Sequence, residues 1–534
     1  MVNGGSAVPI AEPQAQAART APAAPGRTFV ATTLAPPVAA GASAPGGAVV
    51  SRRAAAPPLS VAMPPPPLPS PGPLSVKRPR FGPLPRTMCI THAECASHRV
   101  HKESPEQPAR VAAVVSALHE LRAEAPTTGF TVVELESSPS MLETLEAQLL
   151  GADGSVTDSS SASPAASRAS SSRASSDPSY PPARPRTLAR TDSVVYLESN
   201  ILPAVRAVHS AAYLEKLRST CYQLHLTSQH RKPAGRGSRP KLIRNLSGIS
   251  GDTYASASSL SAALCAALTA CRAVDDVCTA AYRNSFAAIR PPGHHAGAEG
   301  TTAGPAAFAA EAKEAAEMTA VAGADYGVLP SPELPPSPAA HRDRCGQGFC
   351  LLNNAAIAAK HALLAHPASI KRVAIVDIDL HHGQGTQEIV RGWPECLYAS
   401  IHGAGEEFYP MTAQTLQREP RLVNVPLPEG TPAAAYVSAF DEHIVPAVRG
   451  FAPDLILVSC GFDAHKDDSP SLTGFLELDA SDYATVTSRL TGLAAECCDG
   501  RLVSLLEGGY NLTALRDCTR EHVKALARAA VSLP

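Results

Sequence analysis

The chain has 534 residues, of which 18 % are charged and 44 % are apolar, with a net charge of −2. No run of about 18 apolar residues occurs, so no membrane-spanning helix is expected. Thirteen cysteines without a CxxC pair, in a chain of this length, are typical of reduced thiols in a cytosolic or nuclear protein. They argue against a disulfide framework or a zinc finger.

The first 86 residues differ in composition from everything that follows. They hold 19 of the 50 prolines, eight Lys or Arg residues and a single acidic residue, Glu12. Their net charge of +7 leaves −9 for the remainder, which argues against direct nucleic-acid reading by the folded part. Pro/Ala-rich sequence cannot bury enough apolar area to offset its ordering entropy, so residues 1–86 are predicted to be a disordered basic tail.

Two targeting roles of this tail stay open. Its start is basic and poor in acids, as in organelle transit peptides. The run Lys77-Arg78-Pro79-Arg80 lies in Pro-rich sequence and is typical of a nuclear-import patch. We therefore expect the protein in the nucleus, the cytoplasm or both, with organelle import as the alternative.

From residue 87 onward the sequence is periodic and is interrupted by three inserts. Residues 151–190 are rich in serine, residues 228–248 are basic, and residues 297–345 combine an Ala/Glu-rich stretch with a Pro-rich loop. Without these inserts about 340 residues remain, which suits one large catalytic domain over 87–534 better than two independent domains.

Short apolar runs alternate with longer helical patterns along this domain. The predicted strands are 285–289, 372–377, 396–401, 454–459 and 502–507, and the predicted helices include 353–365, 432–448 and 481–497. Near-continuous apolar strands separated by helices are typical of a parallel sheet covered on both faces. The predicted fold is a three-layer αβα domain with a central, mainly parallel sheet that holds ligands at the carboxyl ends of its strands.

Residues of metal-binding and proton-transfer types end or follow four of the predicted strands. They are His294, His295, Asp377, Asp379, His381, Asp463 and Tyr510. A single Asp after a strand is usually a helix cap, but capping does not account for four strands that all deliver such residues to one edge. The pattern predicts a metal-dependent active site.

The spacing favours a catalytic metal. Asp379 and His381 are two residues apart, so their side chains share a face if the chain is extended there. With Asp463 they supply two carboxylates and one imidazole and leave a fourth position open, as in catalytic zinc sites. The same set would also accept Fe(II), Co(II) or Mn(II).

Two further features favour catalysis. His294 and His295 follow a Pro-Pro-Gly turn, where a histidine beside a metal-bound water can take its proton and pass one to a leaving amine. Tyr510 follows two glycines, and its phenol can donate to a developing oxyanion. The alternative for Tyr510 is packing at the sheet edge.

Taken together, the segments RPPGHHA, GFCLLNNAA, DIDLHHGQGTQE, NVPLPEGT, LVSCGFDAHKDD and LLEGGYNL resemble the zinc-dependent histone deacetylase family. LEGGY and GFDAH resemble its class II branch. The resemblance covers roughly residues 87–530 apart from the inserts and implies the arginase-like α/β fold.

The resemblance also implies site roles. Asp379, His381 and Asp463 would bind one zinc ion, with a water in the open position. A structural potassium ion would be held by backbone oxygens of Asp377, Asp379, His381 and Ile401, with Ser400.

For catalysis, the resemblance implies that His295 is the general base and acid. His294 would be its electrostatic partner, oriented by Asp377, and Tyr510 would polarise the substrate carbonyl. Gln384 stands where class I members have an Asp and class II members an Asn, which leaves His295 without a carboxylate partner.

For the substrate, the resemblance implies an acyl-lysine channel between Phe349, beside Gly348, and Tyr409. Asp252 would be a rim carboxylate that contacts the substrate backbone. Tyr409 stands where the family more often has Phe, which implies a slightly more polar channel.

The leading interpretation is a lysine deacetylase that acts on acetylated histone tails or other proteins, in transcriptional repression and with a co-repressor complex. An acetylpolyamine deacetylase is less favoured, because the polyamine branch has a Glu where this chain has Pro470. A non-catalytic co-repressor scaffold is also less favoured, because every proposed catalytic residue is present.

Overall fold

The structure, a computed structural model, describes residues 87–126, 129–137, 146, 148–149, 201–229, 243–246, 252–304, 344–468 and 475–532. The predicted tail (1–86) and the Ser-rich insert (151–190) lie outside these residues, as do most of the inserts 228–248 and 297–345. The predicted domain boundaries therefore stay predictions.

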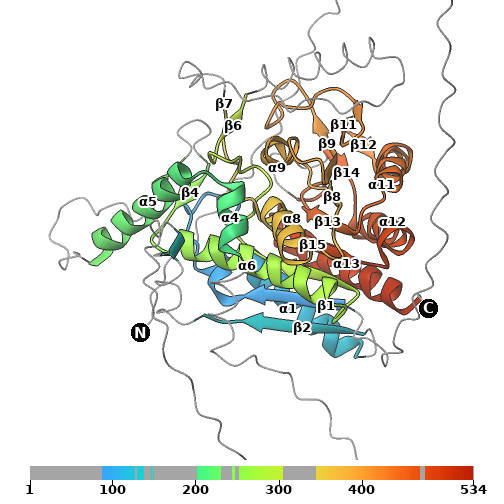
Figure 1. The fold of residues 1–534 in the computed structure, drawn as a ribbon, viewed down its shortest axis with the longest axis horizontal. Coiled ribbons are helices and arrows are strands. Elements are labelled where there is room, and N and C mark those ends of the chain that lie inside the picture. The colour runs from blue at the N-terminus through green and yellow to red at the C-terminus, as the bar shows by residue number, and fades with distance from the viewer. Residues whose placement is uncertain are drawn as a thin grey trace, which may run out of the picture. The chain divides into compact units, whose positions relative to one another are not determined.

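A nine-stranded sheet runs through the described residues (Figure 1). Its strands, in spatial order, are β10 (Gln417–Glu419), β11 (Leu422–Pro428), β9 (Cys396–Ala404), β8 (Val373–Asp377), β13 (Leu455–Cys460), β15 (Leu502–Leu506), β5 (Asn284–Ala288), β1 (Thr87–His92) and β2 (Phe130–Leu135). All neighbours are parallel except β10 and β11, which are antiparallel. The five predicted strands are confirmed and form the contiguous centre of the sheet, from β9 to β5.

Alternate residues of the central strands enter two separate hydrophobic cores. Val373 and Ile375 of β8 pack into one core, whereas Ala374 and Val376 pack into the other. Side chains alternate between the two faces of a strand, so a strand buried on both faces is apolar at every position. This is why the central strands appear in the sequence as short, unbroken apolar runs.

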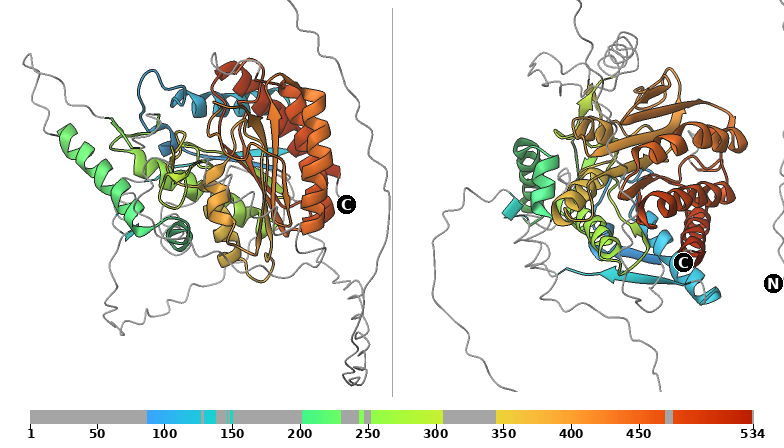
Figure 2. Two further views of the ribbon diagram at one scale, coloured as in Figure 1. Left: turned by 90° about the horizontal axis from the view of Figure 1, so that it is seen from above. Right: turned by 45° about the vertical axis from the view of Figure 1, so that its right-hand side comes forward.

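Helices cover both faces of the sheet. The first core is closed by α4 (Leu202–Val208), α5 (Ala211–Gln229), α6 (Ser259–Cys278) and α8 (Asn354–Ala365). The second core is closed by α1 (Ala109–Glu124), α10 (Ala433–Ala439), α11 (Val445–Phe451), α12 (Ala480–Cys498) and α13 (Leu512–Ser532). Figure 2 shows the green and yellow helices on one side of the strands and the orange and red helices on the other. The predicted three-layer αβα fold is confirmed.

Side-chain caps begin two of the predicted helices. The Asn353 side chain accepts a hydrogen bond from the backbone of Ala356 at the start of α8, and Asp479 and Asp482 form a reciprocal capping box at the start of α12. The predicted helix 432–448 is instead two helices, α10 and α11, joined by a π-helical turn at Phe440–Ile444.

Short elements complete the described chain. They are a 3-10 turn (Ala93–Ala96), α9 (Gln384–Val390), β3 (Arg244–Asn245) paired with β4 (Tyr254–Ala255), β6 (Thr302–Ala303) paired with β7 (Arg344–Cys345), and β12 (Thr431–Pro432) paired with β14 (Leu476–Glu477). The β6–β7 ladder is antiparallel and brings together the two ends of the predicted insert 297–345. Among the described helices, none combines the length and hydropathy that a membrane crossing requires.

Candidate metal centre and active site

Three potential metal ligands converge where β8 and β13 end. The Nδ1 atom of His381 lies 3.1 Å from Oδ2 of Asp463 and 3.3 Å from Oδ1 of Asp379. One ligand atom from each residue lies within 4.8 Å of the other two, and both carboxylates are buried. The predicted ligands are thus brought together from two neighbouring strands.

Backbone N–H groups fix the two carboxylates. Leu380 donates to Oδ1 of Asp463 over 2.9 Å, and Gly508 donates to Oδ2 of Asp379 over 2.8 Å. A Cβ atom on Gly508 would lie only 2.3 Å from Oδ2 of Asp463. Only glycine therefore fits behind the carboxylates at this position.

The charges of this cluster fit a divalent cation. Burial and the nearby charge of Asp379 raise the pKa of Asp463 to about 6. Burial would lower the pKa of His381, but its contacts with the two carboxylates outweigh burial and raise that pKa to about 9. Two buried carboxylates beside one imidazole leave an excess of negative charge, which a bound dication would neutralise. Two carboxylate oxygens and one imidazole nitrogen also match the donor set of catalytic zinc.

His294 is tied to a buried carboxylate. Its Nδ1 atom lies 3.0 Å from Oδ2 of Asp377, which also accepts a hydrogen bond from the hydroxyl of Tyr398 over 2.9 Å. Burial alone would lower the pKa of His294, but the charges of Asp379 and Asp377 outweigh it and raise that pKa to about 10. The structure thus pairs His294 with Asp377, as the family resemblance implied.

His295 has an amide partner instead of a carboxylate. Its Nδ1 atom lies 2.6 Å from Oε1 of Gln384, and its ring lies 3.9 Å from the ring of His294, centroid to centroid. Burial, and then the neighbouring charges of His294 and His381, hold the pKa of His295 well below its usual value. The pKa values of the two adjacent histidines are therefore shifted in opposite directions, which at neutral pH favours a protonated His294 beside a neutral His295.

Glu507, at the end of β15, is a site residue that the sequence interpretation did not single out. Its Oε2 atom accepts from the backbone N–H groups of Gly293 (2.6 Å) and His294 (3.2 Å). Burial raises its pKa to about 7. In the sequence it is the last residue of the predicted strand 502–507, and an acidic residue that ends an otherwise apolar strand was an available signal.

Tyr510 is held from two sides. Its backbone N–H donates to Oδ1 of Asp468 over 2.7 Å, and the guanidinium of Arg110 stacks 4.8 Å from the centre of its ring. Arg110 also donates to the carbonyl oxygens of Glu507 and Gly509. Sequence reasoning missed the positioning contacts of Arg110 and Asp468, whose partners lie far away in the chain.

Aromatic rings lie around this centre. Phe408 stacks on the ring of His381 (5.2 Å, 2° between planes), and the Tyr409 ring meets that of His295 edge to face (4.9 Å). The Tyr409 hydroxyl donates to the carbonyl of Gly346 over 2.7 Å. The predicted wall residue Tyr409 therefore lies beside His295, and Phe408 is an additional aromatic neighbour.

The predicted residues Gly348, Phe349 and Asp252 lie close to one another. Gly348 has φ +46°, and a Cβ atom there would lie 2.3 Å from Cδ2 of His295. The Phe349 ring lies 5.7 Å from that of Tyr510. The Thr253 hydroxyl accepts from the Phe349 N–H and donates to Oδ1 of Asp252. Thr253 thus links Asp252 to Phe349, one of the aromatic residues around the candidate metal centre.

Known proteins resemble the chain in sequence and in fold. The model of the histone deacetylase domain family matches residues 202–318 and 301–526. Type-2 histone deacetylase 2 of Dictyostelium discoideum is 34 % identical over 341 residues, which cover 60 % of this chain and 17 % of that protein. Chloroplastic histone deacetylase 14 of Arabidopsis thaliana is 34 % identical over 288 residues, which cover 52 % of this chain and 56 % of that protein.

The fold agrees with a solved structure. The crystal structure of the HDA15 HD domain matches with a TM-score of 0.50 and 24 % sequence identity, over 83 % of this chain and 90 % of that one. The chain spans less than two thirds of the length of the two relatives named above. The family model covers more than half of this chain, including every residue of the candidate metal centre, and the chain belongs to the histone deacetylase family.

Proposed function

We propose that this protein is a zinc-dependent deacetylase that hydrolyses N6-acetyl-lysine in proteins to lysine and acetate. The observation that carries the proposal is the convergence of Asp379, His381 and Asp463 beside the ring of His295. A potential metal site next to a potential base is the minimum that metal-assisted amide hydrolysis requires.

Asp379, His381 and Asp463 would hold the zinc ion. When bound, zinc would polarise the acetyl carbonyl and make a water molecule more acidic. Family membership and the donor set support zinc. The monovalent cation implied by the resemblance, at Asp377 and Ser400, is part of the same proposal; these two residues are register partners in β8 and β9.

His295 would move the protons. Because its Nδ1 atom faces Gln384, the basic lone pair is on Nε2. Nε2 takes a proton from the attacking water and later delivers it to the lysine nitrogen as the C–N bond breaks. The low pKa of His295 in the free protein keeps it in the form that can accept this proton.

His294 and Tyr510 would stabilise developing charge. His294, protonated and paired with Asp377, offsets negative charge on the tetrahedral intermediate. The Tyr510 phenol keeps its proton at neutral pH because burial raises its pKa well above 10. It can therefore donate a hydrogen bond to the carbonyl oxygen as that oxygen gains charge.

The aromatic residues would hold the acyl-lysine chain. Phe349 and Tyr409 would flank its methylene groups, and the Asp252 carboxylate would accept from a substrate backbone N–H. We propose acetylated histone tails or other acetyl-lysine proteins as substrates, in transcriptional repression and with a co-repressor complex.

We propose that the protein acts in the nucleus, the cytoplasm or both. The chloroplastic relative favours organelle import as the second candidate. Deletion of residues 1–86 from a fluorescent fusion distinguishes the two. Loss of nuclear signal in the deleted fusion supports nuclear import. A mature N-terminus inside the tail, found in the full-length fusion, supports organelle import.

A fluorogenic acetyl-lysine peptide assay tests the activity. The full chain, freed of metal with a chelator and reloaded with zinc, should deacetylate the peptide only after reloading. Acetylspermidine serves as the competing substrate. Turnover of acetylspermidine but not of the peptide would contradict the proposal in favour of a polyamine deacetylase.

A further inference from the structure

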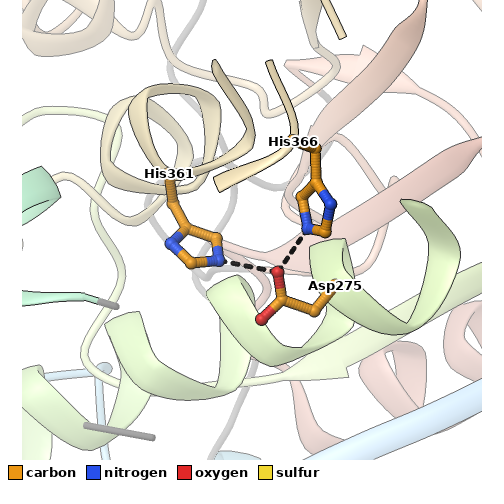
Figure 3. Close-up of side chains that lie close together, drawn as sticks. All are labelled: Asp275, His361 and His366. Atoms are coloured by element: carbon orange, nitrogen blue, oxygen red, sulfur yellow. Dashed lines mark hydrogen bonds and ion pairs between the residues drawn. The ribbon is translucent and has the colours of Figure 1, made fainter. Parts of the chain in front are cut away.

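A second cluster of potential metal ligands joins the two helices α6 and α8 (Figure 3). The Nε2 atom of His361 lies 2.8 Å from Oδ1 of Asp275, and the Nε2 atom of His366 lies 2.6 Å from the same oxygen. The two histidines are 86 and 91 residues from Asp275 in the sequence. Figure 3 shows both rings pointing toward the carboxylate, that of His361 from within α8 and that of His366 from the residue that caps its end.

This cluster is remote from the candidate active site. Helix α8 begins beside the loop that leads from Pro291 to His294 and His295, where the Asn354 side chain donates to the carbonyl of Pro291. At 1.5 Å per residue, the helix carries His366 roughly 18 Å away from that contact. Asp275 lies in the last turn of α6, just before the chain enters β5. The cluster therefore lies toward the amino-terminal ends of the strands, opposite the edge that carries Asp379, His381 and Asp463.

We propose that Asp275, His361 and His366 bind a divalent transition-metal ion, with Zn²⁺ as the best match. Two imidazole nitrogens and one carboxylate oxygen are a common zinc donor set, and a water can occupy the fourth position. Ligand atoms at about 2.0–2.1 Å from a tetrahedral zinc lie roughly 3.3–3.5 Å apart. The two Nε2–Oδ1 distances, 2.8 and 2.6 Å, are shorter than this, so the carboxylate oxygen must move away from both rings to admit the ion.

The burial of the three side chains suits such a site. His361 is fully buried, whereas the side chains of His366 and Asp275 are 15 % and 16 % exposed. The buried ring is fixed by packing between α6 and α8, and the two partly exposed groups leave a route for the ion and its water. A bound ion would clamp together α6 and α8, two of the four helices that close the first core.

The competing explanation is a purely hydrogen-bonded clamp, in which both rings donate N–H groups to Oδ1 of Asp275. It predicts no metal uptake at this place. Metal stoichiometry therefore separates the two explanations, and neither depends on whether the protein is a deacetylase.

The experiment titrates the metal-free full chain with Co²⁺, whose visible absorption reports tetrahedral coordination, and with Zn²⁺ by calorimetry. A double variant, Asp379→Asn with Asp463→Asn, removes two of the three ligands of the catalytic centre. In this background we expect one equivalent of metal to bind. Addition of His366→Ala or Asp275→Asn should abolish that equivalent.

His119→Ala is the matched control. His119 also pairs with a carboxylate, that of Glu134 at 2.8 Å, but on the exposed surface. It belongs to none of the three groups of potential metal ligands among the described residues. It should leave the equivalent unchanged. Zinc should also raise the Tm in the double-variant background, and His366→Ala should remove that rise. The proposal would be overturned if the double variant bound no metal ion. It would also be overturned if the bound ion persisted after both Asp275→Asn and His366→Ala were tested in that background.

Discussion

The Nδ1 atom of His295 lies 2.6 Å from Oε1 of Gln384. The amide nitrogen of Gln384 is directed to the carbonyl of Gly346 at 3.3 Å, so its oxygen faces the ring. An amide oxygen only accepts hydrogen bonds, so Nδ1 carries the proton and Nε2 carries the lone pair. Gln384 thus fixes the tautomer that a general base needs without adding a negative charge.

The first prediction concerns Gln384→Glu. A carboxylate at this place would stabilise protonated His295 and raise its pKa, so less of the base form would exist at a given pH. The acidic limb of the kcat/KM profile should move to higher pH by about one unit or more. The profile is measured on an acetyl-lysine peptide from pH 5 to 9.

Gln384→Asn is the control, because it keeps the amide and shortens it. It should lower kcat without moving the acidic limb. An unmoved limb in Gln384→Glu would contradict the assignment of His295 as the base.

The second prediction concerns the metal ligands. Asp379→Asn, His381→Ala or Asp463→Asn should each remove the catalytic zinc and the activity together, since each takes away one of three protein ligands. Zinc is measured by mass spectrometry of the intact native protein, alongside turnover. An Asp463→Asn protein with wild-type turnover and an unchanged zinc content would refute this centre.

The third prediction concerns Tyr510→Phe. Loss of one oxyanion donor should lower kcat about 10²–10³-fold, or roughly 3–4 kcal/mol, with little change in substrate binding. Zinc content should stay unchanged, because the phenol is not among the ligands. A kcat within about threefold of wild type would assign Tyr510 to packing beside Arg110 and Phe349.

The fourth prediction concerns the pH dependence of stability. The Thr487 hydroxyl donates to the carbonyl of Tyr483, so the Nδ1–H of His522 must donate to Thr487. The other nitrogen, Nε2, meets no hydrogen-bond partner among the described residues, and the ring packs against Phe286 and Phe462. Burial lowers the pKa of His522 to about 3.

The sign follows from proton binding. Between pH 6.5 and about 3 the unfolded chain binds a proton at His522 that the folded chain excludes, so stability falls as pH falls. From pH 7 to pH 5 this histidine should cost roughly 2 kcal/mol. His522→Asn, which can still donate to Thr487, should show a loss smaller by about that amount in urea unfolding. An equal loss in both proteins would contradict the argument.

The sequence predicted the centre of the sheet but not its edges. Strands such as β8, which is buried on both faces and apolar up to its last residue, Asp377, are visible as runs. β1 is equally buried, but its sequence TMCITH mixes Thr and His with apolar residues and gives no such run. By contrast, β10 is the polar segment Gln417–Glu419, and β2 carries Glu134 and half-exposed neighbours at the other edge. Such strands form because a partner strand is present, which local composition does not report.

The candidate site also contains residues that the sequence pattern predicted and residues that it did not. Asp379, His381 and Asp463 lie within four residues of the ends of two predicted strands, and parallel topology brings those strand ends to one edge. The contacts of Glu507, Arg110 and Asp468 depend on loops that meet only in the folded chain. Asp275 and His361 lie inside helices, where a single Asp or His carries no signal of a shared site.

The most direct test of the account is the fate of an acetyl-lysine peptide incubated with the zinc-loaded full chain in ¹⁸O-labelled water. We predict that mass spectrometry finds the free-lysine peptide and acetate that carries one solvent oxygen. His295→Ala, with zinc still bound, should form neither product at a comparable rate. An intact peptide with the zinc-loaded wild-type protein, or acetate without solvent oxygen, would contradict hydrolysis by this centre.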